Sequence, residues 1–382
     1  MQKFGVVLGI AGLVFASACT GGGDTGLSGT ITTGPTGSGS GASGPGGSGG
    51  VGGTGGDGDV GGAAGAGGSG QGGAGGGAPM DVFDPDKDGP FTIAEIDDNQ
   101  WKASTGDTVP MHAAYPTAGP SSGPYPVVVV AHGFQIAASQ YHGYLKRLAS
   151  FGYVAVTPDY PTSLAGTDNT KATQNIISGL DWVESKPELK GDTKLAGATG
   201  HSLGGKLAVY AAKLDERFKA TIVLDPVDGA PSNPLQPNPT CNAPACIDVS
   251  AELPIEKPTG FLGETLDSMT GGFQPACAPA AENFITFYAK AIAPSIAVTI
   301  NGANHVGFVD NTQTCGFACS ACKMPTLDNA TVNALSRAYV TAFYERYLRG
   351  NIAYNAYLTG AEAQARYVDT GIASIQSKTF AP

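Results

Sequence analysis

The chain has 382 residues and a formal net charge of −11, with 32 acidic and 21 basic side chains. This acidic balance argues against a nucleic-acid partner, because the cations needed to neutralise a row of phosphates are missing. Of the 58 glycines, 30 fall among the 60 residues from Gly21 to Met80, so residues 81–382 must supply the folded core.

The first 18 residues have the pattern of an export signal. Lys3 precedes an apolar run from Phe4 to Phe15, which is too short to span a bilayer as a stable helix. The small residues that follow end at Cys19 and resemble the lipobox of bacterial lipoproteins, in which that cysteine is acylated. We therefore expect a protein anchored to the bacterial cell envelope by a lipid on Cys19. An ordinary signal peptide and a secreted protein are the alternative.

Residues 19–80 are rich in glycine, and from residue 21 onward they contain no aromatic side chain and only three charges. Such a composition cannot bury enough apolar surface to offset the loss of chain entropy on folding. Collagen is excluded because glycine does not recur with a strict period of three. We expect a disordered, flexible tether that leads to a single domain over residues 81–382.

Strands and helices are predicted to alternate along this domain. Apolar runs predict strands over 90–96, 109–116, 125–134, 153–160, 193–200, 220–226, 257–264 and 295–303. Helical spacing predicts helices over 140–152, 169–186, 206–218, 281–292 and 328–350. This alternation is typical of an α/β domain with a mostly parallel central sheet and helices on both faces. Ligands of such sheets bind at the carboxyl ends of the strands.

The motif Gly200-His201-Ser202-Leu203-Gly204 lies between a predicted strand and a predicted helix. It fits G-x-S-x-G, the nucleophile elbow of α/β-hydrolases, in which a sharp turn lifts the serine hydroxyl above the sheet. Glycine on each side of the turn prevents clashes between side chains. The alternative is a tight turn that needs glycine and has no chemistry. The strand and helix on either side favour a nucleophilic Ser202.

The nucleophile needs oxyanion donors and a base. The backbone N–H of Leu203 follows the nucleophile, and that of Phe134 follows the strand that ends in His132-Gly133, so both are predicted oxyanion donors. Gly133 could instead serve only to end its strand. His305 follows the last predicted strand and fits the chain order Ser, acid, His, so it is the predicted base; a histidine in a surface loop is the alternative.

The remaining histidines are less suitable as the base. His112 lies in an early predicted strand, His142 begins a predicted helix, and His201 is next to the nucleophile but faces away from it.

Four segments resemble the chlorophyllase family and, more distantly, polyester hydrolases and cutinase-type esterases: VVVVAHGF (127–134), GHSLGGK (200–206), LDPVDG (224–229) and PACAPAAENF (275–284). The resemblance implies an α/β-hydrolase fold and a serine carboxylic-ester hydrolase that works through an acyl-serine intermediate without a cofactor. The plant enzymes typically have arginine where Leu203 stands, so chlorophyll itself is not the expected substrate.

Two aspartates compete for the role of the acid. Asp267 follows the strand over 257–264, which is the usual acid position in this fold, whereas Asp225 lies one strand earlier. Either can reach a histidine loop above the sheet, so topology does not decide between them. The resemblance favours Asp225, because LDPVDG matches the segment that carries the family's catalytic aspartate. Asp228 is a more distant third candidate.

An apolar ester is the expected substrate, because aromatic residues occur in the loops near the predicted site. These are Phe134, Tyr160, Phe261 and Phe308, and the proline-rich residues 229–246 could form a further wall. We expect a monomer whose contact with the membrane is limited to the lipid. The competing function is a cell-surface binding protein that keeps the hydrolase fold without catalysis.

Six cysteines follow Cys19, all in the second half of the chain, and an even number in an exported domain predicts disulfides. We expect Cys241 to pair with Cys246, Cys277 to pair with one of Cys315, Cys319 and Cys322, and the remaining two to pair with each other. The spacing of these last three also matches iron–sulfur enzymes. An exported domain favours disulfides over that cluster and over zinc, so no metal is expected there.

Residues 84–95 satisfy the spacing of an EF-hand calcium loop, with Asp84, Asp86, Asp88, Gly89 and Glu95 at the ligand positions. An EF-hand also needs a helix on each side, and here the glycine-rich segment precedes the loop and a predicted strand follows it. We expect a polar lead-in to the first strand, with structural calcium as the alternative.

Overall fold

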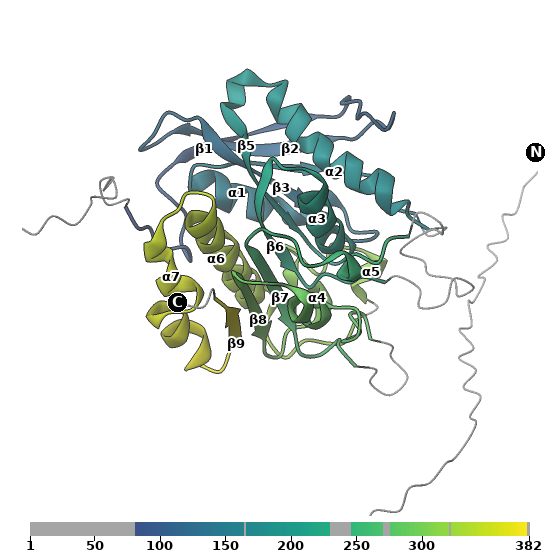
Figure 1. The fold of residues 1–382 in the computed structure, drawn as a ribbon, viewed down its shortest axis with the longest axis vertical. Helices are drawn as coiled ribbons and strands as arrows, with labels where there is room; N and C mark the ends of the chain where they lie inside the picture. The colour runs from purple at the N-terminus through teal and green to yellow at the C-terminus, as the bar shows by residue number, and fades with distance from the viewer. Residues whose placement is uncertain (1–80, 164–165, 230–245, 270–275, 321, 380–382) are drawn as a thin grey trace, which may run out of the picture. The chain divides into compact units, whose positions relative to one another are not determined.

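Nine strands form one sheet in the computed structural model, which describes residues 81–163, 166–229, 246–269, 276–320 and 322–379 (Figure 1). The strand order is β1-β2-β4-β3-β5-β6-β7-β8-β9. The six strands from β4 to β8 are mutually parallel, whereas β2 and β9 run antiparallel to their neighbours. All described residues belong to one compact unit, residues 73–382.

The strands are β1 (Thr92–Asp98), β2 (Met111–Ala118), β3 (Tyr125–Ala131), β4 (Val154–Pro158), β5 (Gly191–Gly200), β6 (Phe218–Leu224), β7 (Thr259–Glu264), β8 (Ser295–Ile300) and β9 (Ala373–Lys378). The α-helices are α1 (His142–Ser150), α2 (Asn169–Glu184), α3 (Leu203–Leu214), α4 (Phe284–Lys290), α5 (Phe317–Ser320), α6 (Asn329–Tyr347), α7 (Asn355–Leu358) and α8 (Ala361–Ala363). Short 3₁₀ turns are η1 (Ala138–Tyr141), η2 (Pro187–Leu189), η3 (Ser250–Glu252), η4 (His305–Phe308) and η5 (Ile352–Tyr354), and a π turn is η6 (Gln364–Val368).

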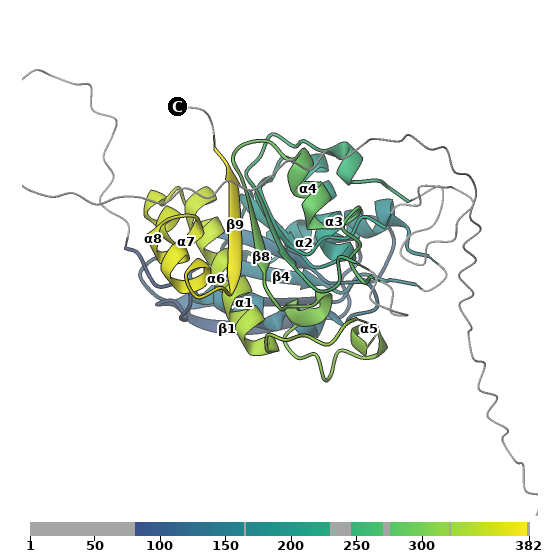
Figure 2. The same ribbon diagram turned by 90° about the horizontal axis from the view of Figure 1, so that it is seen from below.

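Helices cover both faces of the sheet. Figure 2 shows α1, α6, α7 and α8 on one side of the strands and α2, α3 and α4 on the other. Each layer has its own apolar core, one built around α1 and α6 and the other around α2, α3 and α4. This architecture confirms the expected α/β-hydrolase class, a mostly parallel sheet between two helical layers.

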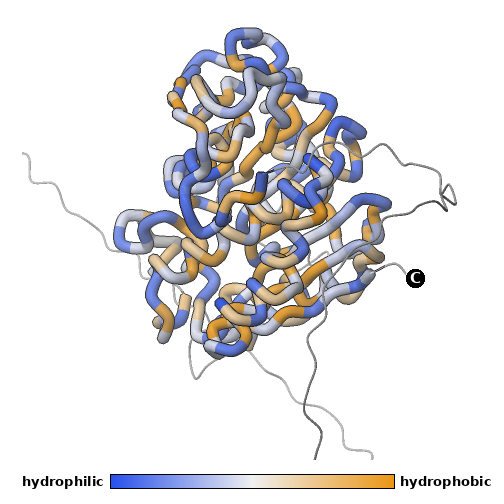
Figure 3. Tube along the Cα trace, turned by 90° about the vertical axis from the view of Figure 1, so that its left-hand side faces the viewer, coloured by the Kyte–Doolittle hydropathy of each residue, from blue (hydrophilic) through white to orange (hydrophobic). Residues whose placement is uncertain are grey.

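The strands in the middle of the sheet are buried on both faces. Every residue of β3, β4 and β7 is buried, and Figure 3 shows hydrophobic stretches in the interior of the trace with hydrophilic turns at its periphery. Strands covered on both sides need continuous apolar runs rather than alternation, which is why YPVVVVA predicts its strand so clearly. Every strand and helix predicted from sequence is present, with bounds that differ by a few residues.

The edge strand β9 was not predicted. Its sequence ASIQSK has only one strongly apolar residue, Ile375, and most of its residues are exposed or half-buried where it pairs antiparallel with β8. An edge strand of this kind depends on its neighbour rather than on its own composition, so single-sequence patterns do not reveal it.

The disulfides hold loops in the second half of the domain. Cys277 is bonded to Cys322 and Cys315 to Cys319, which is one of the arrangements that the sequence left open. Cys246 is also disulfide-bonded, while Cys241 lies outside the described residues. The expected export signal, Cys19, the tether and most of the proline-rich wall lie outside them as well. Among the described helices, none combines the length and the apolar character that crossing a membrane requires.

Two carboxylates of the segment that resembles an EF-hand form ion pairs with an arginine. Arg366 Nη1 donates to Asp84 Oδ1 at 2.7 Å and also to Asp86, whose other oxygen accepts the Tyr367 hydroxyl at 2.7 Å. Glu95, the expected twelfth ligand, lies on β1 and contacts other residues. The carboxylates thus anchor the start of the domain to η6, and the polar lead-in is the interpretation that fits.

Candidate active site

Ser202 lies with His201 between the end of β5 and the start of α3, at the carboxyl edge of the sheet. Its backbone has φ 56° and ψ −123°, a left-handed conformation that is costly for a residue with a side chain. Hydrogen bonds hold this turn in place, because Ser202 N donates to Leu224 O at 3.0 Å and its carbonyl accepts from Lys206 N at 3.0 Å. The strained turn leaves the hydroxyl partly exposed above the sheet.

The glycines on each side of Ser202 are required by close backbone contacts. A Cβ on Gly200 would lie 2.3 Å from Gly204 O, and one on Gly204 would lie 2.4 Å from both Ala131 O and His132 O. Either side chain would displace the helix from the strands. The G-x-S-x-G pattern is therefore a packing requirement of this turn, and α3 begins at Leu203 rather than after the glycines as predicted.

A continuous line of hydrogen bonds joins three of the predicted residues. His305 Nε2 is 2.8 Å from Ser202 Oγ, and His305 Nδ1 is 2.6 Å from Asp225 Oδ2. Because a carboxylate only accepts, Nδ1 carries the proton and Nε2 is left to accept the serine hydroxyl. The three residues come from the turn after β5, the end of β6 and η4. Asp225 also has a positive φ, 40°, as its side chain turns toward His305.

The electrostatics of this line favour a histidine that accepts protons readily. Burial by itself would lower the pKa of His305, but the hydrogen bond and charge of Asp225, with the charges of Glu264 and Asp267, raise it above its usual value. Burial raises the pKa of Asp225, while His305 opposes that rise. The pair together stabilises an imidazolium beside Ser202, which is the species formed when the serine loses its proton.

Asp267, the competing acid, contacts the backbone of the histidine instead of its ring. Its Oδ2 accepts from His305 N at 2.9 Å and its Oδ1 accepts from Lys323 N at 3.0 Å. It therefore fixes the position of the histidine loop. Asp228, the third candidate, accepts from the backbone N–H groups of Val249 and Ser250 and forms an ion pair with Lys206.

The two expected oxyanion donors lie on the turns that flank Ser202. Leu203 is the first residue of α3, where backbone N–H groups have no partner within the helix and the helix dipole favours negative charge. Phe134 follows β3, and its loop is held because Gly133 N donates to the Tyr141 hydroxyl at 3.1 Å. This loop lies against the elbow, since His201 N donates to Ala131 O at 3.1 Å.

His201 connects the oxyanion loop to the histidine loop, a role that the sequence did not reveal. Its Nε2 is 2.8 Å from the carbonyl of His305, so Nε2 carries the proton, and its Nδ1 accepts the Tyr141 hydroxyl at 2.8 Å. Burial holds the pKa of His201 well below its usual value, so it stays neutral. One fixed network therefore runs from Gly133 through Tyr141 and His201 to the backbone of His305.

Three of the four aromatic residues expected to contact substrate are fully buried. Tyr160 stacks on His132 and its hydroxyl donates to the carbonyl of that residue, while Phe261 and Phe308 have no exposed surface. Phe261 packs against α4, and Phe308 lies beside His201. All three residues belong to the core and not to a substrate-binding surface: Phe261 lies within β7, and the loop positions of Tyr160 and Phe308 in the sequence did not reveal that their side chains turn inward. Phe134 is half-buried and remains a candidate.

Glu264 is a further carboxyl group at this edge that the sequence did not single out. It ends β7, and its Oε2 accepts from Asp267 N at 2.7 Å and from Leu266 N. Its Oε1 is buried and has no hydrogen-bond partner among the described residues. Burial, followed by the charge of Asp225, raises the pKa of Glu264 to about 8.

Comparison with known proteins gives a consistent result. A family model described as Chlorophyllase matches residues 80–366. Chlorophyllase-1 of Arabidopsis thaliana is 28% identical over 220 residues, covering 54% of this chain and 65% of that protein. Chlorophyllase-2 of the same plant is 27% identical over 208 residues, covering 50% and 62%. Bis(hydroxyethyl) terephthalate hydrolase of Streptomyces coelicolor is 31% identical over 142 residues, covering 36% and 44%. The matches span less than two thirds of the length of each of these relatives.

Proposed function

This chain belongs to the chlorophyllase family, and from that premise we propose that it is a carboxylic-ester hydrolase that works through an acyl-serine intermediate on Ser202. The observation that carries the proposal is the unbroken line of hydrogen bonds from Ser202 through His305 to Asp225. A nucleophile, a base within hydrogen-bond reach and a third group that orients the base are the parts that acyl transfer needs.

In the first half of the reaction, His305 Nε2 takes the proton of Ser202 as Oγ attacks the ester carbonyl carbon. The electron pair of the carbonyl moves onto its oxygen, which the N–H groups of Leu203 and Phe134 stabilise. The intermediate then collapses, the bond to the alcohol oxygen breaks, and His305 returns the proton to the departing alcohol. Asp225 keeps the ring in the required tautomer throughout and stabilises its positive charge.

In the second half, a water molecule takes the place of the alcohol. His305 removes one proton from the water, the hydroxide oxygen attacks the acyl carbon, and collapse of the second intermediate releases the carboxylic acid. The proton on His305 returns to Ser202 Oγ, so the enzyme is regenerated without a cofactor. Every proton transfer uses His305 Nε2, and the two that involve Ser202 use its 2.8 Å contact with Oγ.

The proposed substrate is an apolar ester with a short or medium acyl group. The half-buried Phe134 beside the expected oxyanion position offers an apolar contact. The printed names of the relatives include a hydrolase of bis(hydroxyethyl) terephthalate, which is an aromatic diester. Peptides are not expected substrates, because amides need stronger activation of the leaving group than esters do.

Labelling with a fluorophosphonate tests whether the serine is an activated nucleophile. The protein should be labelled and should hydrolyse p-nitrophenyl butyrate, whereas Ser202→Ala should lose both properties. Ser121→Ala, which changes an exposed serine, is the matched control and should behave like the parent. A folded parent protein that neither reacts with the probe nor cleaves any ester would favour the non-catalytic binding protein instead.

A further inference from the structure

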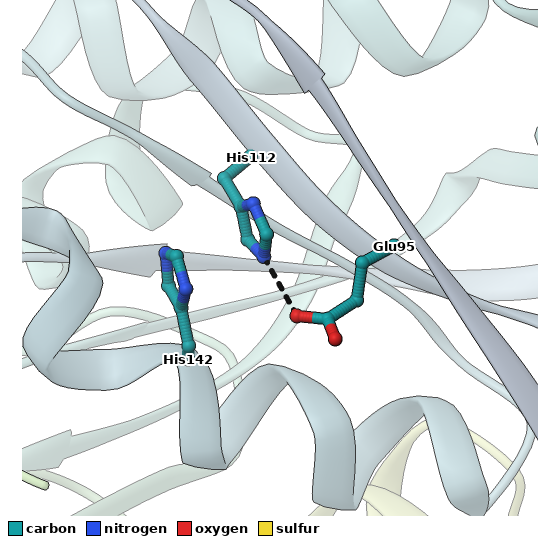
Figure 4. A group of neighbouring side chains, drawn as sticks. All are labelled: Glu95, His112 and His142. Carbon is teal, nitrogen blue, oxygen red and sulfur yellow. Dashed lines mark hydrogen bonds and ion pairs between the residues drawn. The ribbon is translucent and has the colours of Figure 1, made fainter.

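A second group of polar side chains lies away from the serine, where the first two strands meet the start of α1. Glu95 comes from β1, His112 from β2, and His142 is the first residue of α1 (Figure 4). One nitrogen or oxygen atom from each of these side chains lies within 4.8 Å of the others. Nothing in the proposed ester hydrolysis uses these residues.

The register of the strands places the two strand residues on one face of the sheet. His112 is directly opposite Asp97 in the antiparallel pair of β1 and β2, and Glu95 lies two residues before Asp97. Residues two apart on a strand, and residues directly opposite across a pair, share a face. Helix α1 packs against both strands, so the side chain of His142 lies close to those of Glu95 and His112. The group is thus assembled from three elements that the fold keeps together.

The hydrogen bonds leave one nitrogen of His112 ready to bind a cation. Asp97 Oδ1 is 2.7 Å from His112 Nδ1, which places the ring proton on Nδ1 and the lone pair on Nε2. That Nε2 is 3.1 Å from Glu95 Oε2, so a lone pair and a carboxylate oxygen face each other. Lys146 occupies the other oxygen of Glu95, Oε1, at 3.1 Å. Either a second proton on the His112 ring or a shared cation turns this contact into an attraction.

His142 completes the set. Its ring is stacked on that of His112 with the centroids 3.6 Å apart and the planes 6° from parallel, so one of the two rings must rotate about its Cβ–Cγ bond before both can direct a lone pair at one ion. Both rings are half-buried, whereas Glu95 is exposed, so the group opens to solvent on the carboxylate side. We propose that Glu95, His112 and His142 bind a divalent transition-metal ion of the zinc class, with a water molecule as the fourth ligand.

The donor set selects this class of ion. Two imidazoles and one carboxylate suit zinc and its neighbours, whereas calcium and magnesium prefer oxygen ligands alone. Ligands about 2 Å from a tetrahedral zinc ion lie roughly 3.3 Å from each other, close to the separation of His112 Nε2 and Glu95 Oε2. Asp97 supplies the carboxylate partner that zinc-binding histidines commonly have.

A second group with similar spacing, Asp267 with Cys277 and Cys322, does not offer the same chemistry. Its two sulfur atoms are bonded to each other, so no thiolate is available. The metal bound at the histidine group would join β1 and β2 to α1. Its expected effect is therefore on stability rather than on the reacting atoms.

Metal binding is tested on the full chain without a polyhistidine tag. Dialysis against zinc chloride, followed by elemental analysis, should give one zinc ion per chain, and zinc should raise the Tm. His112→Ala and His142→Ala should each lose the ion and the rise in Tm. Glu95→Gln, a change at an exposed position, removes a direct ligand and should weaken zinc binding by more than about 100-fold, and Asp97→Asn, which alters the partner of His112, by about 10- to 100-fold. Cobalt bound in place of zinc should give the visible spectrum of a four-coordinate site with nitrogen and oxygen ligands.

Two controls separate this site from other places where zinc could bind. Glu188→Gln removes an exposed carboxylate elsewhere and should leave zinc binding unchanged. His305→Ala should also keep the ion, because His305 belongs to the proposed catalytic line. Zinc that is lost only in His305→Ala, an ion retained in both His112→Ala and His142→Ala, or no binding at 100-fold molar excess of zinc would each overturn the proposal. None of these outcomes bears on esterase activity, which Ser202→Ala tests separately.

Discussion

Asp225 and Asp267 both contact His305, but at different atoms, and this difference predicts different kinetic effects. Asp225→Asn removes the negative charge that stabilises the imidazolium and lets an amide N–H donate to Nδ1, which holds the wrong tautomer, so kcat should fall by about 10³- to 10⁴-fold with KM nearly unchanged. Asp267→Asn keeps an oxygen for only one of the two backbone N–H groups of His305 and Lys323 but leaves the ring of His305 paired with Asp225, so kcat should fall by less than about tenfold. Steady-state kinetics on p-nitrophenyl butyrate measures both. The reverse order of losses would assign the acid to Asp267.

The pH dependence of activity follows from the same contacts. Only neutral His305 can accept the proton of Ser202, so kcat/KM should fall as the pH decreases through the pKa of His305. Because Asp225 and the neighbouring carboxyl groups outweigh the effect of burial, this midpoint should lie above 6.5, the usual pKa of histidine. Rate measurements from pH 5 to 9 locate it. A midpoint below 6.5 would mean that burial dominates over Asp225.

The buried carboxyl group of Glu264 should make the free energy of unfolding depend on pH. Its pKa is about 8 in the folded protein against a usual value of 4.5, mainly because it is buried. Between these values the unfolded chain releases a proton that the folded chain retains, so the free energy of unfolding should decrease as the pH rises from 4.5 to about 8. In Glu264→Gln this contribution is absent, and the decrease should be smaller. Urea unfolding at pH 5, 6.5 and 8 compares the two proteins, and parallel curves would contradict the assignment.

Among single residues, the sequence identified the proposed catalytic residues better than it identified the residues that hold them in position. Ser202, His305 and Asp225 could be named because motif, chain order and family resemblance converge on them. Tyr141, His201 and Glu264 could not, because their roles depend on where a side chain points after folding. The same reason explains why Tyr160, Phe261 and Phe308 were wrongly expected to contact the substrate: an aromatic residue near the carboxyl end of a strand is equally compatible with a pocket wall and with the core.

The elements that carry the site are joined by a buried ion pair. Lys206 lies on α3 with no exposed surface, and its Nζ is 3.3 Å from Asp228 Oδ1 and 2.5 Å from the carbonyl of Asp228. Asp228 lies in the loop after β6, three residues beyond Asp225. The ion pair therefore ties the loop that holds the proposed acid to the helix that begins at the nucleophile.

Lys206→Met should destabilise the protein by about 3–5 kcal/mol, because it leaves the carboxylate of Asp228 buried without its cation. Lys213→Met on the same helix is the matched control. Its ion pair with Glu252 is exposed, so the cost should be less than about 1 kcal/mol. Urea unfolding of both variants measures the difference, and equal costs would show that the buried pair is not what joins these elements.

The elements themselves were largely predictable, for a physical reason. Strands buried on both faces, such as β3 and β4, carry continuous apolar runs, and helices with one buried face, such as α1, carry a clear period. The short elements α7, α8 and β9 have neither a continuous apolar run nor a helical period. They are stabilised by the apolar core that α6 helps to form, so their own sequences do not reveal them. The site could be located without the edge strand β9 because its three residues follow β5, β6 and β8, which the sequence predicted.

For the whole molecule, we propose a catalytic domain that is held to the cell envelope by a lipid on Cys19. The support is the lipobox-like sequence that ends at this cysteine and the glycine-rich composition of residues 21–80. Residues 81–379 contain every side chain of the proposed catalytic line. Attachment and catalysis should therefore be separable properties.

Cys19→Ser removes the only thiol that the lipobox could acylate, so the variant should no longer partition with membranes after cell fractionation. Mass spectrometry of the N-terminal peptide should find diacylglycerol on Cys19 in the parent and none in the variant. Ser17→Ala, which changes the same small-residue run but keeps the cysteine, should remain in the membrane fraction. Any soluble Cys19→Ser protein should keep the specific activity of the parent, because the hydrogen-bonded line from Ser202 to Asp225 lies wholly within the folded domain. A Cys19→Ser protein that fractionates like the parent would disprove the lipid anchor and leave an ordinary signal peptide as the explanation of the N-terminus.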